Sequence, residues 1–114
     1  MPFQAFDSHI RKEGDTAIID LQGEINGLAE ADLNQAYTQT EASGVHTIVL
    51  NFSQVDYINS TGIALIVGLL ARARKERKTL AVYGLSPHDR EIFEITRLVD
   101  FMKVFEDETS AIAG

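Results

Sequence analysis

Two segments near the N-terminus have the pattern of paired strands. Gln4–Arg11 and Thr16–Glu24 flank the turn-forming residues Glu13–Asp15, and the second segment alternates apolar with polar side chains. Strict alternation is typical of a strand with one face buried. The pattern therefore predicts two strands joined by a turn.

A helical pattern follows this pair. Apolar side chains recur four, seven and eight residues after the first, at Ala29, Leu33, Ala36 and Tyr37. This spacing places them on one helix face. Asn26 can cap the start of the helix, and Ser43 with Gly44 can end it.

The middle of the chain combines a strand, a loop and an apolar helix. Val45–Phe52 is apolar on both faces of a strand, with Val45 and Val49 on one side and Ile48, Leu50 and Phe52 on the other. A strand of this kind is central and covered on both faces. We expect a loop over Ser53–Asn59 and a helix from Ser60 to about Lys78, apolar nearly all round in its first three turns.

The C-terminal third alternates in the same way. Thr79–Tyr83 favours a strand, and Ser86, Pro87 and Asp89 form a helix-start signature. The helix that follows is expected to turn Ile92, Phe93 and Ile95 inward and to end near Val99. Phe101–Phe105 suits an edge strand, and Glu106–Glu108 the start of a small terminal helix. Strands that alternate with helices predict an α/β fold, here with a mixed sheet because of the first hairpin.

The predicted middle helix ends in cations: Arg72, Arg74, Lys75, Arg77 and Lys78. Cations are favoured at a helix C-terminus, where long side chains also keep an exposed end soluble. A partner-binding patch is the alternative interpretation.

Length, net charge and apolar content limit the kinds of protein that this sequence can encode. The 114 residues, 45% apolar and 24% charged, suit one folded domain spanning residues 1–114. A net charge of −7 opposes binding to nucleic acid or anionic lipid. The longest apolar run, 62–71, is half of the roughly 20 residues that a membrane span needs. Residues 1–10 carry no secretory signal pattern, so we expect a cytoplasmic location.

Few residues suggest catalysis or metal binding. The chain has no cysteine, and His9, His46 and His88 are scattered. We therefore expect no metal and no cofactor, and a structural role for His46 within the central strand. The sequence contains no hydrolase serine motif, phosphate-binding loop or dinucleotide-binding motif.

The sharpest feature is Asn59-Ser60-Thr61-Gly62, between the predicted loop and the apolar helix. Asn59 or Ser60 can cap that helix, which is a purely structural explanation. Two hydroxyls exceed the needs of one cap, however, and Gly62 lets backbone or a partner approach closely. A phosphoryl group here would add about 1.5 to 2 negative charges where a helix N-terminus stabilises an anion.

Four segments, in this order, resemble the STAS domain family, and specifically its stand-alone bacterial anti-sigma factor antagonists. They are Leu21–Asn26, Ile48–Phe52, Asp56–Gly62, and Leu85–Pro87 ahead of Ile92-Phe93. The resemblance implies a mixed sheet of four or five strands with helices mainly on one face. It also implies a partner switch: the unmodified domain binds an anti-sigma factor serine kinase, phosphorylation releases it, and a metal-dependent serine phosphatase resets it.

The resemblance assigns the phosphate to Ser60, with Thr61 as the second candidate. The partner surface would comprise Asn26, Gly27, Tyr57, Ile58, Asn59, Thr61, Gly62 and Ile63. Asn59 and Asn26 both stand where the family usually has Asp. Each change removes a negative charge near Ser60, and we hypothesise that this lowers the like-charge penalty on phosphorylation.

Three other functions remain open. A scaffold or sensor-linked STAS module would assemble a complex without reversible phosphorylation. A small-ligand or nucleotide-binding domain would need a concave site that the sequence does not advertise. An enzyme ranks last, because Ser60 has no histidine base nearby in the sequence.

Overall fold

Five strands form one mixed sheet in the order β1-β2-β3-β4-β5 in the computed structural model, which describes residues 5–114. The hairpin of β1 and β2 is antiparallel, and each later strand pairs in parallel with its predecessor. The strands are β1 (Asp7–Glu13), β2 (Thr16–Ile25), β3 (Thr47–Ile58), β4 (Thr79–Tyr83) and β5 (Lys103–Phe105).

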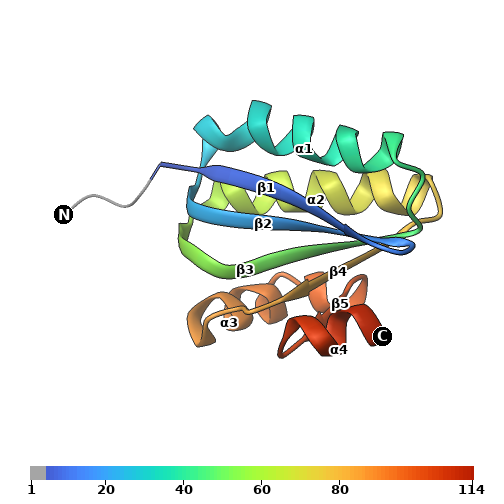
Figure 1. Cartoon of the computed structure of the whole chain (residues 1–114). Helices are drawn as coiled ribbons and strands as arrows, with labels where there is room; N and C mark the ends of the chain where they lie inside the picture. Colours follow the sequence, from blue (N-terminus) through green and yellow to red (C-terminus); the bar gives the residue numbers. More distant parts are fainter. Residues whose placement is uncertain (1–4) are drawn as a thin grey trace.

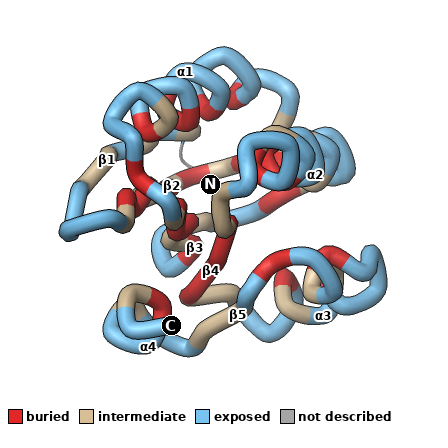
Figure 2. The backbone as a smooth tube through the Cα atoms, turned by 90° about the vertical axis from the view of Figure 1, so that its right-hand side faces the viewer, coloured by how far each residue is buried: buried red, intermediate tan, exposed pale blue. Residues whose placement is uncertain are grey.

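Three helices connect the parallel strands, a fourth follows β5, and the helices lie mainly on one face of the sheet. They are α1 (Glu30–Ala42), α2 (Ser60–Lys75), α3 (Pro87–Ile95) and α4 (Glu108–Ala113). Short 3₁₀ turns occupy Gly27–Ala29 and Leu98–Asp100. Figure 1 shows α1 beside α2, and in Figure 2 α4 lies across the sheet from them. The expected mixed sheet with helices mainly on one face is confirmed.

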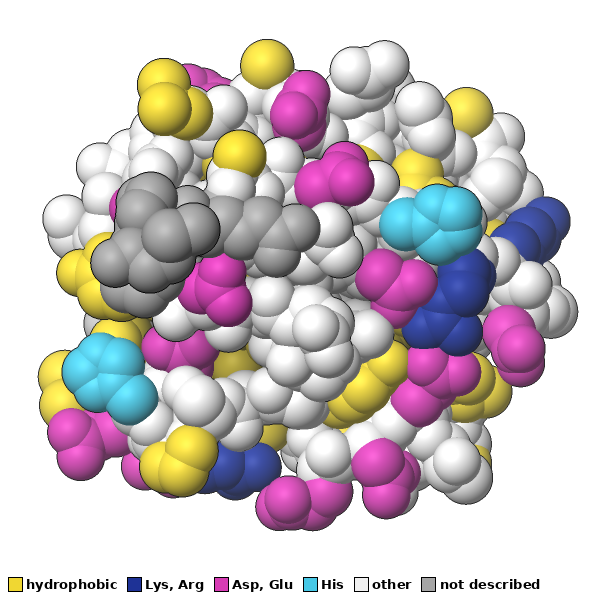
Figure 3. All heavy atoms as spheres, turned by 60° about the vertical axis from the view of Figure 1, so that its left-hand side comes forward, with side chains coloured by type: hydrophobic (Ala, Val, Ile, Leu, Met, Phe, Trp, Pro, Cys, Tyr) yellow, Lys and Arg dark blue, Asp and Glu magenta, His cyan; other side chains and the backbone are white. Residues whose placement is uncertain are grey.

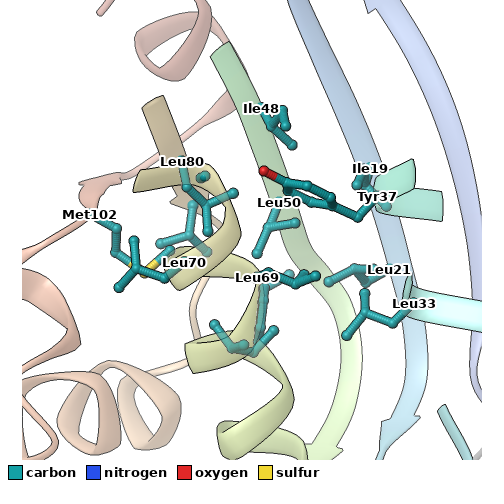
Figure 4. Close-up of a cluster of buried hydrophobic side chains, with 14 of the residues drawn as sticks. Ile19, Leu21, Leu33, Tyr37, Ile48, Leu50, Leu69, Leu70, Leu80 and Met102 are labelled. Carbon is teal, nitrogen blue, oxygen red and sulfur yellow. The ribbon is translucent and has the colours of Figure 1, made fainter. Parts of the chain in front are cut away.

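The main core lies between the sheet and α1, α2 and α3. Figure 4 shows Leu33 and Tyr37 of α1 and Leu69 of α2 directed toward Ile19 and Leu50 of the strands. The predicted inward face of α1 is confirmed, because Ala29, Leu33, Ala36 and Tyr37 are all buried. Phe93 attaches α3 to this core through an edge-on contact with Phe52, with ring centroids 5.6 Å apart.

A smaller cluster covers the opposite face of the sheet. Ile18, Val49, Ala81 and Tyr83 pack there with Ala111 of α4. The central strand is therefore apolar on both faces, as its sequence predicts, although only one small helix covers the second face. Val45 was assigned to the side of Val49, and that was wrong: it precedes β3 and packs in the main core.

A polar network ties α4 to the N-terminal hairpin. Arg11 of β1 forms ion pairs with Asp20 of β2 at 2.7 Å and with Glu108 of α4 at 2.6 Å. Glu108 also accepts a hydrogen bond from the Tyr83 hydroxyl, and Asp20 accepts one from Asn51. Hydrogen bonds from Arg11 and Tyr83 lower the pKa of the Glu108 carboxyl.

The expected loop over Ser53–Asn59 was wrong. β3 continues to Ile58 because its second half pairs with β2, ending with Ile58 beside Ile25. This pairing joins residues distant in the sequence, so local pattern does not reveal it. The longer strand delivers Asn59 directly to the start of α2.

Three further predictions about single positions were wrong. His46 is exposed and precedes β3 rather than lying within it, and Ile95 is 72% exposed rather than inward. α2 ends at Lys75, because Arg77 adopts a left-handed backbone with φ of 59°. Gln4, where the first strand was expected to begin, lies outside the described residues.

The cations at the end of α2 make contacts within the chain. The Arg72 guanidinium lies 4.5 Å from the centre of the Tyr37 ring and pairs with Glu41 of α1 at 2.5 Å. Lys78 donates a hydrogen bond to the carbonyl of Val45. These contacts favour the structural interpretation of the basic end. No helix among residues 5–114 has the length and apolar character of a membrane span.

Candidate functional site

Three parallel strands end at one edge of the sheet, and each leads into a helical segment there. β2 leads into the turn Gly27–Ala29, β3 into α2, and β4, through a short connection, into α3. Figure 1 shows these ends together on the left of the molecule. The carboxyl edge of parallel strands is the usual place for ligands and functional loops in α/β proteins.

Asn59 caps α2. Its backbone is extended, and its side-chain oxygen accepts a hydrogen bond from the Gly62 N–H at 2.8 Å. Asn59 also donates its own N–H to the Ile25 carbonyl oxygen at 3.2 Å, which joins the start of α2 to the end of β2. The capping expected from the sequence is therefore present, and Ser60 is left as the first residue of the helix.

Gly62 is required by the packing of α2 on β2. A Cβ atom at this position would lie 2.2 Å from the Ile25 carbonyl oxygen and 2.7 Å from Cγ1 of Ile58. Of the two possibilities that the sequence left open for Gly62, the structure shows close approach of backbone. This contact fixes where the first turn of α2 lies.

The hydroxyl of Ser60 is open to solvent. Ser60 is exposed, and within residues 5–114 its side chain takes part in no hydrogen bond. It stands at the helix end where unpaired backbone N–H groups and the helix dipole favour negative charge. Its free hydroxyl can accept a modification without loss of an existing contact.

Thr61 faces the loop that follows β2. A Cβ added to Gly27 would lie 3.6 Å from Cγ2 of Thr61, so the two segments are neighbours. On this loop the side-chain oxygen of Asn26 accepts a hydrogen bond from the Leu28 N–H at 2.9 Å. Asn26 thus caps the 3₁₀ turn rather than α1 itself.

A groove of about 320 Å³ runs from Ser60 to α3. Its lining comprises Tyr57, Ile58, Asn59, Ser60, Ile63, His88, Ile92 and Thr96. More of this lining is apolar than polar, so a partner's apolar side chain could be buried there. Sequence reasoning missed the α3 residues, because only the tertiary packing of α3 beside α2 brings them to the site.

The start of α3 is well fixed. The Ser86 hydroxyl oxygen accepts the Asp89 N–H at 3.0 Å, and Pro87 occupies the first turn. Burial raises the pKa of the Asp89 carboxyl, while charge on His88 and a hydrogen bond from Ser86 act in the opposite direction. The His88 side chain is exposed and takes part in no hydrogen bond within residues 5–114.

The structure brings together the nine residues expected at this site. Asn26, Gly27, Tyr57, Asn59, Ser60, Thr61 and Ile63 are exposed or half-buried, whereas Ile58 and Gly62 are buried. Buried Ile58 and Gly62 support the surface from beneath. Leu28, which is 91% exposed beside Gly27, was missed; an apolar residue inside the polar segment that follows β2 was its only signal.

The surroundings of the site are predominantly acidic. Figure 3, in which this edge of the sheet comes forward, shows acidic side chains spread over the visible face and few lysines or arginines. A protein partner with a basic contact surface would therefore match the face around Ser60.

Within the described part of the chain, no three His, Asp or Glu side chains gather as a metal site would require.

The comparisons with known proteins agree with this architecture. A curated relative from Staphylococcus aureus, an anti-sigma-B factor antagonist, is 33% identical over 88 residues, which cover 77% of this chain and 82% of the relative. The corresponding Staphylococcus epidermidis protein is 31% identical over the same coverage.

Solved structures share the fold at lower identity. An anti-sigma factor antagonist from Mycobacterium paratuberculosis superposes with a TM-score of 0.83 at 18% identity, covering 96% of this chain and 92% of its own. Phosphorylated SpoIIAA, a Bacillus cell fate determinant, gives 0.72 at 24% identity, covering 96% and 97%. The model of the STAS domain matches residues 8–111, and the chain therefore belongs to the STAS domain family.

Proposed function

We propose that this protein is an anti-sigma factor antagonist that switches partners through phosphorylation of Ser60. The unmodified protein binds an anti-sigma factor serine kinase, and the phosphorylated protein releases it. A metal-dependent serine phosphatase restores the first state. In this proposal the protein acts by regulated binding, carries out no catalysis itself and needs no cofactor.

One observation carries the proposal: the Ser60 hydroxyl is exposed and unbonded at the N-terminus of an apolar helix. Its position lets a kinase reach the oxygen while the helix end stabilises the phosphate formed there. The named staphylococcal relatives support the choice of partner class, and the phosphorylated SpoIIAA structure shows that this fold accommodates the modification.

The site accounts for release in physical terms. The exposed surface around Ser60 combines Leu28, Tyr57 and the groove beside α3. A partner that covers this surface would have to remove about 1.5 to 2 charges of phosphate from water. Because an unpaired buried charge is strongly unfavourable, phosphorylation lowers the affinity for a partner that lacks a matching cation.

Capture of partners from native lysate tests the proposal. Ser60→Ala protein should retain a kinase-like protein that Ser60→Asp protein loses. The captured kinase with ATP should then phosphorylate the wild-type chain at Ser60, as mapped by mass spectrometry, with Thr61→Ala as the control that stays modified. Phosphate on Thr61 alone would reassign the acceptor.

The same experiment distinguishes the phosphorylation switch from the main alternative, a scaffold. A scaffold STAS module would hold its partner equally in the Ser60→Ala and Ser60→Asp forms. A cytoplasmic location and the absence of nucleic acid among the partners stay predictions of this account.

A further inference from the structure

Ser60 and His88 line the same groove. Ser60 begins α2, His88 lies in the first turn of α3, and both line the groove between these helix starts. Both side chains are exposed, and neither has a hydrogen-bond partner within residues 5–114. Each is therefore free to reorient toward a new group in the groove.

His88 is the member of the groove lining that can carry positive charge. The other lining residues are Tyr57, Ile58, Asn59, Ser60, Ile63, Ile92 and Thr96. The next cation along α3, Arg90, is directed to Glu106, with which it pairs at 3.3 Å. On the same helix, the neighbouring residue Asp89 is 6% exposed, and charge on His88 acts to lower the pKa of its carboxyl.

A phosphate on Ser60 would change the chemistry of this groove. It would bring three strong acceptor oxygens and a charge of about −1.5 to −2 at neutral pH. An imidazolium N–H is a donor suited to such an oxygen, and hydrogen bonds between charged partners are shorter and stronger than neutral ones. The side chains of Ile58, Ile63 and Ile92 in the same lining offer the phosphate no competing hydrogen bond.

We propose that His88 recognises the phosphate on Ser60, so that a hydrogen bond from its imidazole ties the start of α3 to the start of α2. This inference rests on the proposed phosphorylation of Ser60 and adds a second consequence to it. The modified side chain and His88 together cover the groove, which removes the apolar surface offered to the partner. Phosphorylation then acts by closing a binding groove as well as by adding charge.

Phosphorus NMR of protein that carries phosphoserine at position 60 tests the contact. Phosphoserine is inserted during translation, so the sample needs no kinase. The second pKa of the phosphate is measured by titration in the otherwise wild-type chain and in the His88→Gln and His88→Arg variants. Gln keeps hydrogen-bonding capacity without charge, and Arg keeps the charge.

The wild-type chain should show a phosphate pKa about 0.5 unit lower than the His88→Gln chain, because a nearby cation favours the dianion. His88→Arg should retain the low value. His46→Gln is the matched control: His46 is also exposed but precedes β3, at the strand end opposite Ser60, and its replacement should leave the phosphate pKa unchanged.

Equal phosphate pKa values in the wild-type and His88→Gln chains would overturn the inference. This result is distinct from failure of the proposed function. A chain that no kinase modifies at Ser60 refutes the switch, whereas the titration of inserted phosphoserine still reports whether His88 reaches it.

Discussion

Single residues at the start of α2 carry the site, and Gly62 is the most constrained of them. Its position leaves no room for a Cβ beside the Ile25 carbonyl. Because that obstacle is backbone, the change Gly62→Ala should lower the free energy of unfolding by about 3 kcal/mol, as overpacking does. Urea denaturation measures this.

Gly68 supplies a matched control within the same helix. It is exposed, and a Cβ there would meet nothing within 4 Å. Gly68→Ala should stabilise the protein by about 1 kcal/mol through helix propensity. Equal effects of the two substitutions would contradict the packing assigned to Gly62.

At the residue scale, Asn59 and Asn26 are the two positions where the resemblance to the family implies Asp. Both retain capping hydrogen bonds, so they preserve local geometry without negative charge. Asn59→Asp should therefore slow phosphorylation of Ser60 by the captured kinase, because two negative groups would then approach each other. A faster reaction would count against this role for the missing charge; circular dichroism of the variant checks that α2 is intact.

At the scale of elements, Phe93 is the fully buried apolar side chain by which α3 packs on the core. Phe93 is fully buried against Phe52, whereas Ile95 two residues later is 72% exposed. Phe93→Ala should cost about 3 to 5 kcal/mol of stability. Ile95→Ala should change stability by less than about 0.5 kcal/mol, and a large loss there would show that α3 packs in another orientation.

The elements also show how far local sequence pattern reaches. The inward face of α1, the capped starts of α2 and α3, and the hairpin all follow from periodicity and capping residues. The extension of β3 to Ile58 does not, because it depends on pairing with β2. The exposure of Ile95 could have been predicted, because a residue two positions after buried Phe93 lies about 200° away around the helix.

The candidate site also contains residues that the local sequence predicts and residues that only tertiary packing reveals. Ser60, Asn59 and the β2 loop could be chosen from motif and order alone. His88 and Ile92 could not, because they reach the groove only through the packing of α3 beside α2. Leu28 could not be chosen either, because the sequence does not show that its side chain is 91% exposed.

At the scale of the whole molecule, the Arg11 network joins α4, near the C-terminus, to the hairpin of β1 and β2. Hydrogen bonds from Arg11 and Tyr83 lower the pKa of the Glu108 carboxyl. Burial acts to raise the pKa of the Asp20 carboxyl, but hydrogen bonds from Arg11 and Asn51 outweigh burial and lower that pKa overall. A carboxyl whose folded pKa is lowered stabilises the protein above its unfolded pKa, about 4. This contribution is lost as the pH falls through the folded value.

Glu108→Gln should accordingly destabilise the protein by about 1 kcal/mol at pH 7, since the ion pairs are partly exposed. The difference from wild type should shrink as the pH falls below about 4. Urea denaturation at pH 7 and pH 3 measures both values. A difference that is independent of pH would exclude the ionised carboxylate as its source.

The affinity of the captured kinase for the chain with serine or phosphoserine at position 60 tests the account most directly. Calorimetric titration of both forms should show at least about tenfold weaker binding to the phosphorylated chain, since a new charge must be buried at the interface. Equal affinities for the two forms would contradict the switch.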